Sequence, residues 1–115
     1  PDSVSTINPD QLDVAAAKDI YDQIKNASFV QASQLLYNQG HDQYSARKYD
    51  EALKLLEKSY EYNPDNVDAI YFIGRSYHQM GDLENAATYY TKLTEGFPDS
   101  NRAREADSKL REIGR

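Results

Sequence analysis

The residues that could do chemistry in this chain are few and far apart. Its two histidines, His41 and His78, stand 37 residues apart, and it has no cysteine. No His-Glu-x-x-His pattern and no nucleophile elbow is present, and Gly74-Arg75-Ser76 lacks the second glycine and the lysine of a phosphate-binding loop. We therefore interpret both histidines as surface or groove residues. We expect no catalytic residue, no metal site, no cofactor and no enzymatic activity.

The charged residues indicate a solvated surface and narrow the class of partner. Carboxylates recur at helical spacing, at Asp13, Asp19 and Asp22 and again at Glu57 and Glu61, which is typical of a solvated helix face. The formal net charge is −6. Because affinity for nucleic acid comes largely from neutralised phosphates, this acidity argues against nucleic acid as a partner. No apolar run approaches the roughly 18 residues of a membrane span, so we expect no membrane insertion in this segment.

The elements that must position these residues are predicted to be helices, because apolar residues recur with helical period and no segment alternates like a strand. A helix is predicted over residues 9–26, starting at the cap Asn8 and following a flexible lead-in over residues 1–8. Ser28 is a second capping residue, which predicts a new helix over residues 29–46.

Four further helices are predicted over residues 49–62, 67–80, 83–95 and 101–113. Proline follows two of these helices, Pro64 after the helix over 49–62 and Pro98 after the helix over 83–95. We expect Gly81 to adopt the left-handed conformation at the end of one helix and Asp82 to cap the next.

The chain repeats itself with a period of 34 residues. Like residues occur at the paired positions Leu36/Ile70, Tyr37/Tyr71, Gly40/Gly74, Tyr49/Leu83, Ala52/Ala86, Leu56/Tyr90 and Pro64/Pro98. One such period accommodates two short antiparallel helices and two turns. We interpret Gly40 with Ala52, and Gly74 with Ala86, as the small residues that let the two helices of a pair approach closely.

This pattern resembles the tetratricopeptide repeat (TPR) family in its bacterial-type form. The second copy carries the residues of the family motif, namely Ile70, Ile73, Gly74, Tyr77, Gly81, Ala86, Tyr90 and Pro98. In the first copy Gln39 and Gln43 stand where the family usually has Leu and Tyr, and Arg47 replaces the turn glycine. The resemblance implies an all-α, TPR-like α-solenoid: a superhelix of two helix-turn-helix repeats between an N-terminal helix and a C-terminal capping helix.

The resemblance also divides the chain into parts. These are a lead-in over 1–8, an N-terminal helical segment over 9–32, repeat 1 over 33–66, repeat 2 over 67–100 and the capping helix over 101–115. Because two repeats bury little core by themselves, we expect the helices at 9–26 and 101–113 to supply the missing burial.

The resemblance further implies a concave surface lined by the first helix of each pair. The repeat register places three rows of residues there: Gln34, Tyr37, His41 and Tyr44; Asp68, Tyr71, Arg75 and His78; and Arg102, Glu105, Lys109 and Glu112. The candidate partner-binding residues among them are Tyr37, His41, Tyr44, Tyr71, Arg75, His78, Arg102 and Lys109. Tyrosine and arginine are the residue types that most often anchor interfaces, and we expect the three tyrosines to be exposed in the groove.

The function that this resemblance implies is non-catalytic. We expect a scaffold or adaptor module that binds a peptide or protein, with acidic and apolar side chains, on its concave face. The alternative is a structural oligomerisation domain of a larger envelope-associated bacterial protein, with a possible homodimer through the N-terminal helix. The sequence Phe97-Pro98-Asp99-Ser100 looks like TPR proteins of the bacterial cell envelope, although the absence of cysteine fits the cytoplasm equally well.

Overall fold

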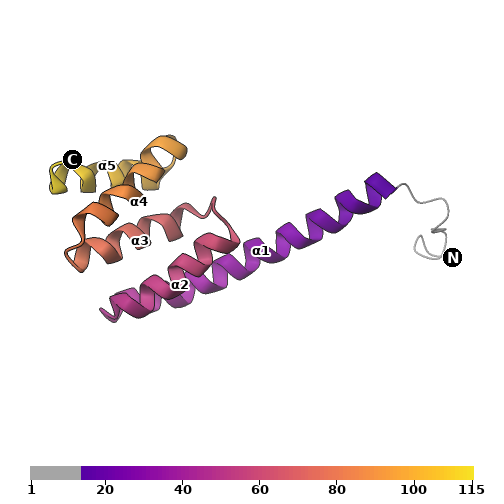
Figure 1. Cartoon of the computed structure of the whole chain (residues 1–115), viewed down its shortest axis with the longest axis horizontal. Coiled ribbons are helices and arrows are strands. Elements are labelled where there is room, and N and C mark those ends of the chain that lie inside the picture. Colours follow the sequence, from indigo (N-terminus) through magenta and orange to yellow (C-terminus); the bar gives the residue numbers. More distant parts are fainter. Residues whose placement is uncertain (1–13) are drawn as a thin grey trace.

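The computed structural model describes residues 14–115, with side chains from Asp22 onward. Over this range the chain forms helices and no strand, which confirms the all-α prediction (Figure 1). The helices are α1 (Val14–Ser45), α2 (Tyr49–Tyr62), α3 (Val67–Gln79), α4 (Leu83–Gly96) and α5 (Asn101–Ile113). None of them is long and apolar enough to cross a membrane.

The helices form the expected repeated pairs. The C-terminal half of α1 packs along α2, α3 packs along α4, and α5 packs on α4. In addition α1 contacts α3, and α3 contacts α5, so the first helices of successive units lie side by side. The core between these layers is fully buried at Leu56, Ile70, Ile73, Tyr90 and Leu93. The TPR-like arrangement is thus confirmed, and the residue boundaries of its parts stay a prediction.

The first helix is continuous, so the predicted break between residues 26 and 29 is wrong. Asn26, Ala27 and Ser28 lie inside α1. The Ser28 hydroxyl donates a hydrogen bond to the carbonyl oxygen of Ile24, one turn back (3.1 Å), and does not cap a new helix. Serine and asparagine are only weak helix breakers, and neither proline nor glycine is present to end the helix here.

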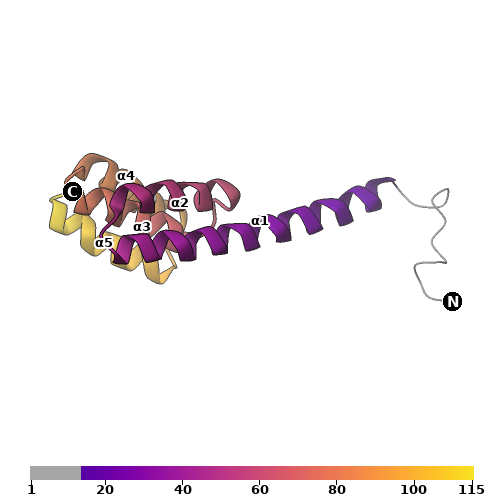
Figure 2. The same ribbon diagram turned by 90° about the horizontal axis from the view of Figure 1, so that it is seen from below.

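The N-terminal part of α1 projects away from the repeats as a rod (Figure 2). Every residue from 22 to 28 is exposed, and the contacts with α2 begin at Phe29, whose ring lies 5.7 Å from that of Tyr62. The expectation that the helix at 9–26 helps to cover the repeat core is therefore wrong for residues 22–26. The predicted lead-in over residues 1–8 lies outside the described residues.

The two turns within the repeats have the same backbone conformation although their residues differ. Gly81 has φ +83°, as expected, and the Asp82 carboxylate accepts a hydrogen bond from the backbone N–H of Asn85 (3.2 Å). Arg47, at the equivalent position of the first turn, has φ +63°. The residue after it, Lys48, makes no side-chain cap. The first turn therefore has a strained, left-handed arginine and lacks the side-chain cap that stabilises the second turn.

The glycines of the first helices set how closely each pair packs. A Cβ atom built on Gly40 would lie 2.7 Å from Cγ of Leu56, and one built on Gly74 would lie 2.7 Å from Cε1 of Tyr90. Ala52 and Ala86 are fully buried in the same interfaces. The small residues thus act as predicted, with Leu56 and Tyr90 as the side chains that fill the space they leave.

A buried polar cluster ties the first pair to the start of α3. The hydroxyls of Ser33 and Ser59 each donate to the other residue's backbone carbonyl, both at 2.7 Å. The side-chain amide of Asn66 donates to Ser33 Oγ (3.0 Å), and its oxygen accepts from the N–H of Ala69, capping α3. This cluster fixes α1, α2 and α3 relative to one another, and so fixes the surface that α1 and α3 share.

Candidate functional site

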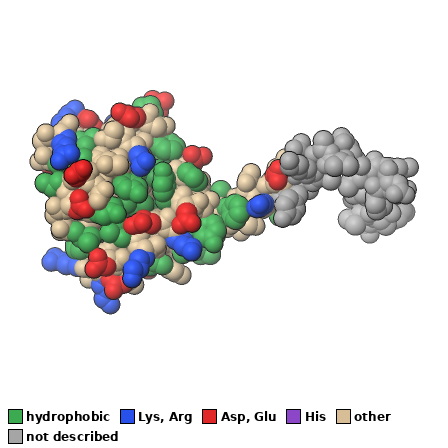
Figure 3. Space-filling model, in the orientation of Figure 1, with side chains coloured by type: hydrophobic (Ala, Val, Ile, Leu, Met, Phe, Trp, Pro, Cys, Tyr) green, Lys and Arg blue, Asp and Glu red, His purple; other side chains and the backbone are tan. Residues whose placement is uncertain are grey.

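The surface formed by α1, α3 and α5 carries all three rows of the predicted groove, and we call it the α1–α3–α5 surface. Of the eight candidate residues, seven are half-buried, a state compatible with contact to both core and partner: Tyr37, His41, Tyr44, Arg75, His78, Arg102 and Lys109. Whether they bind a partner stays a prediction. Figure 3 shows hydrophobic side chains exposed among charged ones on the repeat block.

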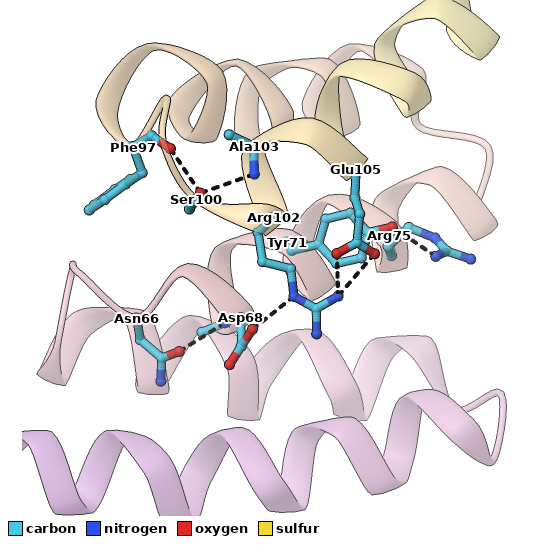
Figure 4. Close-up of polar contacts among 10 residues, drawn as sticks. Asn66, Asp68, Tyr71, Arg75, Phe97, Ser100, Arg102, Ala103 and Glu105 are labelled. Carbon is cyan, nitrogen blue, oxygen red and sulfur yellow. Dashed lines mark hydrogen bonds and ion pairs between the residues drawn. The ribbon is translucent and has the colours of Figure 1, made fainter.

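The eighth candidate, Tyr71, is only 3% exposed, so the prediction that it faces an open groove is wrong. The guanidinium of Arg102 reaches across from α5 and lies over the rings of Tyr71 and Phe72, at 4.7 and 5.1 Å from their centroids. Figure 4 shows this side chain extending from α5 towards Asp68 on α3. The groove is therefore filled by the chain itself where α5 meets the start of α3.

Ion pairs hold Arg102 in this position. Its Nε donates to Oδ1 of Asp68 (2.8 Å), and Nη1 donates to Glu105 on the same helix (3.2 Å). Although partial burial disfavours the charged form, the bond to Asp68 and the nearby carboxylates raise the pKa of Arg102 above its ordinary value. Arg102 is thus a permanent cation that is already paired.

Phe72 is the centre of the aromatic cluster on this surface, and sequence reasoning missed it. The rings of His41 and Tyr44 meet its ring edge-on, with centroids 4.7 and 5.1 Å away, and Tyr37 lies at 6.1 Å. The predicted rows included Tyr71 but not its neighbour Phe72. The available signal was the repeat comparison, since Phe72 stands where the other units have Asn38 and Ala106.

Arg75 occupies the open half of the surface, between α1 and α3. Its Nη1 donates a hydrogen bond to the hydroxyl of Tyr71 (3.1 Å), and its guanidinium lies over the rings of Tyr44 (5.8 Å) and Tyr71 (5.7 Å). The row register predicted His41 as its neighbour on α1, whereas Tyr44, one turn further on, lies under it. Among the residues whose side chains are described, no carboxylate forms an ion pair with Arg75.

The charge of Arg75 is secure. Partial burial acts to lower its pKa, but the hydrogen bond to Tyr71 and the phenol oxygens of Tyr44 and Tyr90 outweigh this and raise the pKa above its ordinary value. Arg75 is therefore a preorganised cation whose remaining donors have no acidic partner within the described part of the chain.

His78 lies one turn beyond Arg75 on α3 and contacts the core. Its Nδ1 is 3.1 Å from the hydroxyl of the fully buried Tyr90, within hydrogen-bond distance. Burial, and then the charges of Lys109 and Arg75, lower the pKa of His78, while Glu112 opposes them. Lys109 itself forms an ion pair with Glu112 (3.1 Å).

The structure does not bring the two histidines together. His41 packs on Phe72, and His78 packs on Tyr90. Within the described residues, no three side chains of the metal-ligating types gather at one place. The surface therefore offers a cluster of aromatic rings with the cation of Arg75 at its open end. We call this cluster the aromatic platform, and it comprises Tyr37, His41, Tyr44 and Phe72.

Comparison with known proteins agrees with this architecture. A family model described as tetratricopeptide repeat matches residues 37–101, which is more than half of the chain. The tetratricopeptide repeat protein 30 homologs of Caenorhabditis briggsae and Caenorhabditis elegans are each 33% identical over 51 residues. That match spans 44% of this chain and only 8% of the length of each relative. The bacterial and cell-envelope expectations stay predictions. The chain, with its matched helix pairs and its glycine-mediated packing, belongs to the tetratricopeptide repeat family.

Proposed function

We propose that this chain is a protein-binding module that holds an acidic, partly apolar peptide segment across the α1–α3 half of the α1–α3–α5 surface. Protein–protein interaction is what TPR repeats generally mediate, which gives the coarse function. The finer assignment, to this part of the surface and to an acidic segment, is our proposal.

The observation that carries the proposal is the state of Arg75. An arginine fixed by a phenol hydroxyl and two rings loses little side-chain entropy on binding, and its fork of donors matches a carboxylate. Arg102 is not equivalent, because Asp68 and Glu105 already occupy its donors. The free donors of Arg75 favour a partner that supplies a carboxylate.

The neighbourhood of Arg75 supports an apolar contribution as well. Tyr37, Tyr44 and His41 surround Phe72 and are half-buried, so their outer faces remain available to a partner. Aromatic side chains give large contact area at low entropic cost, which is why they concentrate in interface hot spots. A segment with an apolar side chain next to a carboxylate would satisfy both features.

The test is selection of a random peptide library on the purified chain and on its Arg75→Glu variant. We expect the wild type to enrich peptides that carry Asp or Glu next to an apolar residue. Charge reversal at Arg75 removes the favourable ion pair and adds repulsion, so it is expected to weaken binding of such peptides at least ~10-fold. The measurement is a binding titration with the enriched peptides.

Lys58→Glu is the matched control, because Lys58 is exposed on α2 and lies off the α1–α3–α5 surface. It makes the same change in net charge and is expected to leave affinity nearly unchanged. Backbone amide NMR shifts on peptide binding are expected to cluster on α1 and α3. Equal losses in the two variants, or shifts confined to α2 and α4, would overturn the proposal.

A further inference from the structure

One face of α1 is apolar or uncharged and is left open. It comprises Ile24, Ser28, Gln31, Leu35 and Asn38, all exposed, and we call it the α1 outer face. Ile24 is 63% and Leu35 64% exposed, more than any other large hydrophobic side chain in the described residues. These two aliphatic side chains lie on one helix face, eleven residues apart, with Ser28 and Gln31 between them.

At Leu35 and Asn38, the repeat shows that the equivalent positions of the later units are covered. The positions 34 and 68 residues after Leu35 are Ala69 and Ala103, and both are buried against the preceding helix pair, at 0% and 4% exposed. The counterpart of Asn38 in α3 is Phe72, which is 8% exposed. In α3 and α5 this face is an interface with the preceding unit. On α1 no preceding unit is present among the described residues.

The described part of the chain cannot cover this face by folding back. Where a preceding repeat would require a turn before residue 33, α1 continues as one helix from Val14 to Ser45. Figures 1 and 2 show it running straight away from the repeat block. Within residues 14–115, no element covers this face.

The spacing and chemistry of the face favour a second copy of this chain as the covering element. Its positions are four, three, four and three residues apart, which is the seam of a two-helix coiled coil. None of these five side chains is charged, so two identical copies meet at these positions without repulsion. Gln31 and Asn38 end in amides, which both donate and accept hydrogen bonds and can pair with their own kind. The oxygen of Asn38 already accepts from Nε2 of Gln34 (3.0 Å), so Asn38 offers its N–H groups.

The other exposed helix faces lack this property. That of α2 carries Lys54, Glu57, Lys58 and Glu61, and α4 and α5 also carry charges on their exposed sides. We propose that two copies of this chain associate through the α1 outer face, forming a homodimer. The association leaves the α1–α3–α5 surface free, because Tyr37, His41 and Tyr44 point from α1 towards Phe72 on α3.

The first experiment is sedimentation equilibrium of the full chain at several concentrations. We expect a reversible monomer–dimer equilibrium. Leu35→Glu places a carboxylate in the seam and is expected to raise the dissociation constant ~100-fold or more, since an unpaired buried charge is costly. Leu83→Glu is the matched control: Leu83 is also exposed (41%), the chemical change is identical, and it lies on α4.

A wild type that stays monomeric at every concentration, or equal effects of the two glutamate substitutions, would overturn this proposal. Circular dichroism checks that both variants keep their helices, which is expected because both leucines are exposed. The outcome is independent of peptide binding, because Arg75→Glu changes the proposed peptide site and leaves the α1 outer face unaltered. A dimer that Arg75→Glu abolishes would equally count against the α1 outer face.

Cysteine cross-linking gives a positive readout, since the chain has no cysteine of its own. Under mild oxidation, Leu35→Cys is expected to form interchain disulfides with itself if the helices run parallel, and with Ile24→Cys if they run antiparallel. Leu83→Cys measures the background of random collisions. Rates no faster than that background for both pairings would contradict the proposal.

Discussion

Arg47 and Gly81 occupy equivalent turns, and both have positive φ, at +63° and +83°. For a residue with a Cβ atom this conformation costs about 1–2 kcal/mol, whereas glycine adopts it freely. Part of that gain is offset because glycine also makes the unfolded chain more flexible. We therefore expect Arg47→Gly to stabilise the protein by ~0.5–1 kcal/mol.

Urea denaturation of wild type and Arg47→Gly measures this difference. Arg47 is exposed and forms no ion pair with the described carboxylates, so little else is lost with the side chain. Gly81→Ala is the reciprocal change and is expected to destabilise, because it brings a Cβ atom into the same conformation with nothing else in its way. If Arg47→Gly lowered the stability, the strain assigned to the first turn would be refuted.

We expect His78 to make the free energy of unfolding depend on pH. Because its pKa is lowered in the folded protein, the unfolded chain takes up the proton first as pH falls. The folded state is therefore favoured fully while His78 is neutral in both states, above the ordinary histidine pKa of about 6.5. This stability is lost as pH falls below that value towards the lower pKa of the folded protein. The charged groups that face His78 are Lys109, Arg75 and Glu112.

The expected result is that the free energy of unfolding falls more between pH ~7.5 and pH ~5.5 for the wild type than for His78→Asn. Asparagine has no charge to gain, and its side-chain amide can replace the Nδ1 contact with Tyr90. Identical pH profiles would show that His78 does not contribute.

At the scale of elements, Arg102 is the main polar link between α5 and α3. The partly exposed ion pair with Asp68 contributes only about 0–1 kcal/mol, but the contacts with the rings of Tyr71 and Phe72 add about 0.5–1 kcal/mol each. Arg102→Ala removes all of these contacts, whereas Asp68→Ala leaves the two ring contacts in place. We expect Arg102→Ala to destabilise by ~1–2 kcal/mol and Asp68→Ala by less than half of that.

Thermal or urea denaturation of the two single variants and the double variant measures each contribution. The double variant is expected to resemble Arg102→Ala alone, because the ion pair is already gone. Were Asp68→Ala the more harmful change, the ion pair and not the stacking would hold α5.

The helix boundaries show what the sequence could specify. Strong signals gave the later elements correctly: Pro64 and Pro98 end their helices, and Gly81 with Asp82 forms the expected turn. The break expected at Ser28 rested on one weak capping residue, and its hydroxyl has an equally good acceptor one turn back within the helix.

The candidate surface was predictable only in part, and for a physical reason. The period of 34 residues located which helices share a face, so Arg75 and Tyr44 were found. It could not tell which side chain a neighbouring helix covers. Tyr71 is buried, and one of the side chains over its ring is Arg102, 31 positions away along the chain. Contacts of that kind depend on side-chain rotamers and are not encoded in residue spacing.

At the scale of the whole molecule, α5 closes an otherwise unfinished stack. Ala103 and Ala106 are buried against α4, and Leu93 beneath them is fully buried. Deleting residues 99–115 would expose Leu93 and uncover Tyr71 and Phe72, so we expect a loss of ~3 kcal/mol or more, and a fall in Tm of ~10 °C or more.

The matched truncation removes only Gly114 and Arg115, which are exposed. Calorimetry is expected to show a small shift for this variant beside a large one for the loss of α5. Similar shifts for the two truncations would mean that the last helix adds little to the fold.

The unbroken course of α1 has a mechanical consequence. A helix couples rotation to translation, about 100° and 1.5 Å for every residue. The orientation of the aromatic platform, relative to any group attached at the first turns of α1, therefore depends on the number of helical residues between them. One residue inserted near Lys25 would rotate the platform by more than a quarter of a revolution about the helix axis. Seven inserted residues would restore nearly the original orientation and move the platform about 10 Å along the axis.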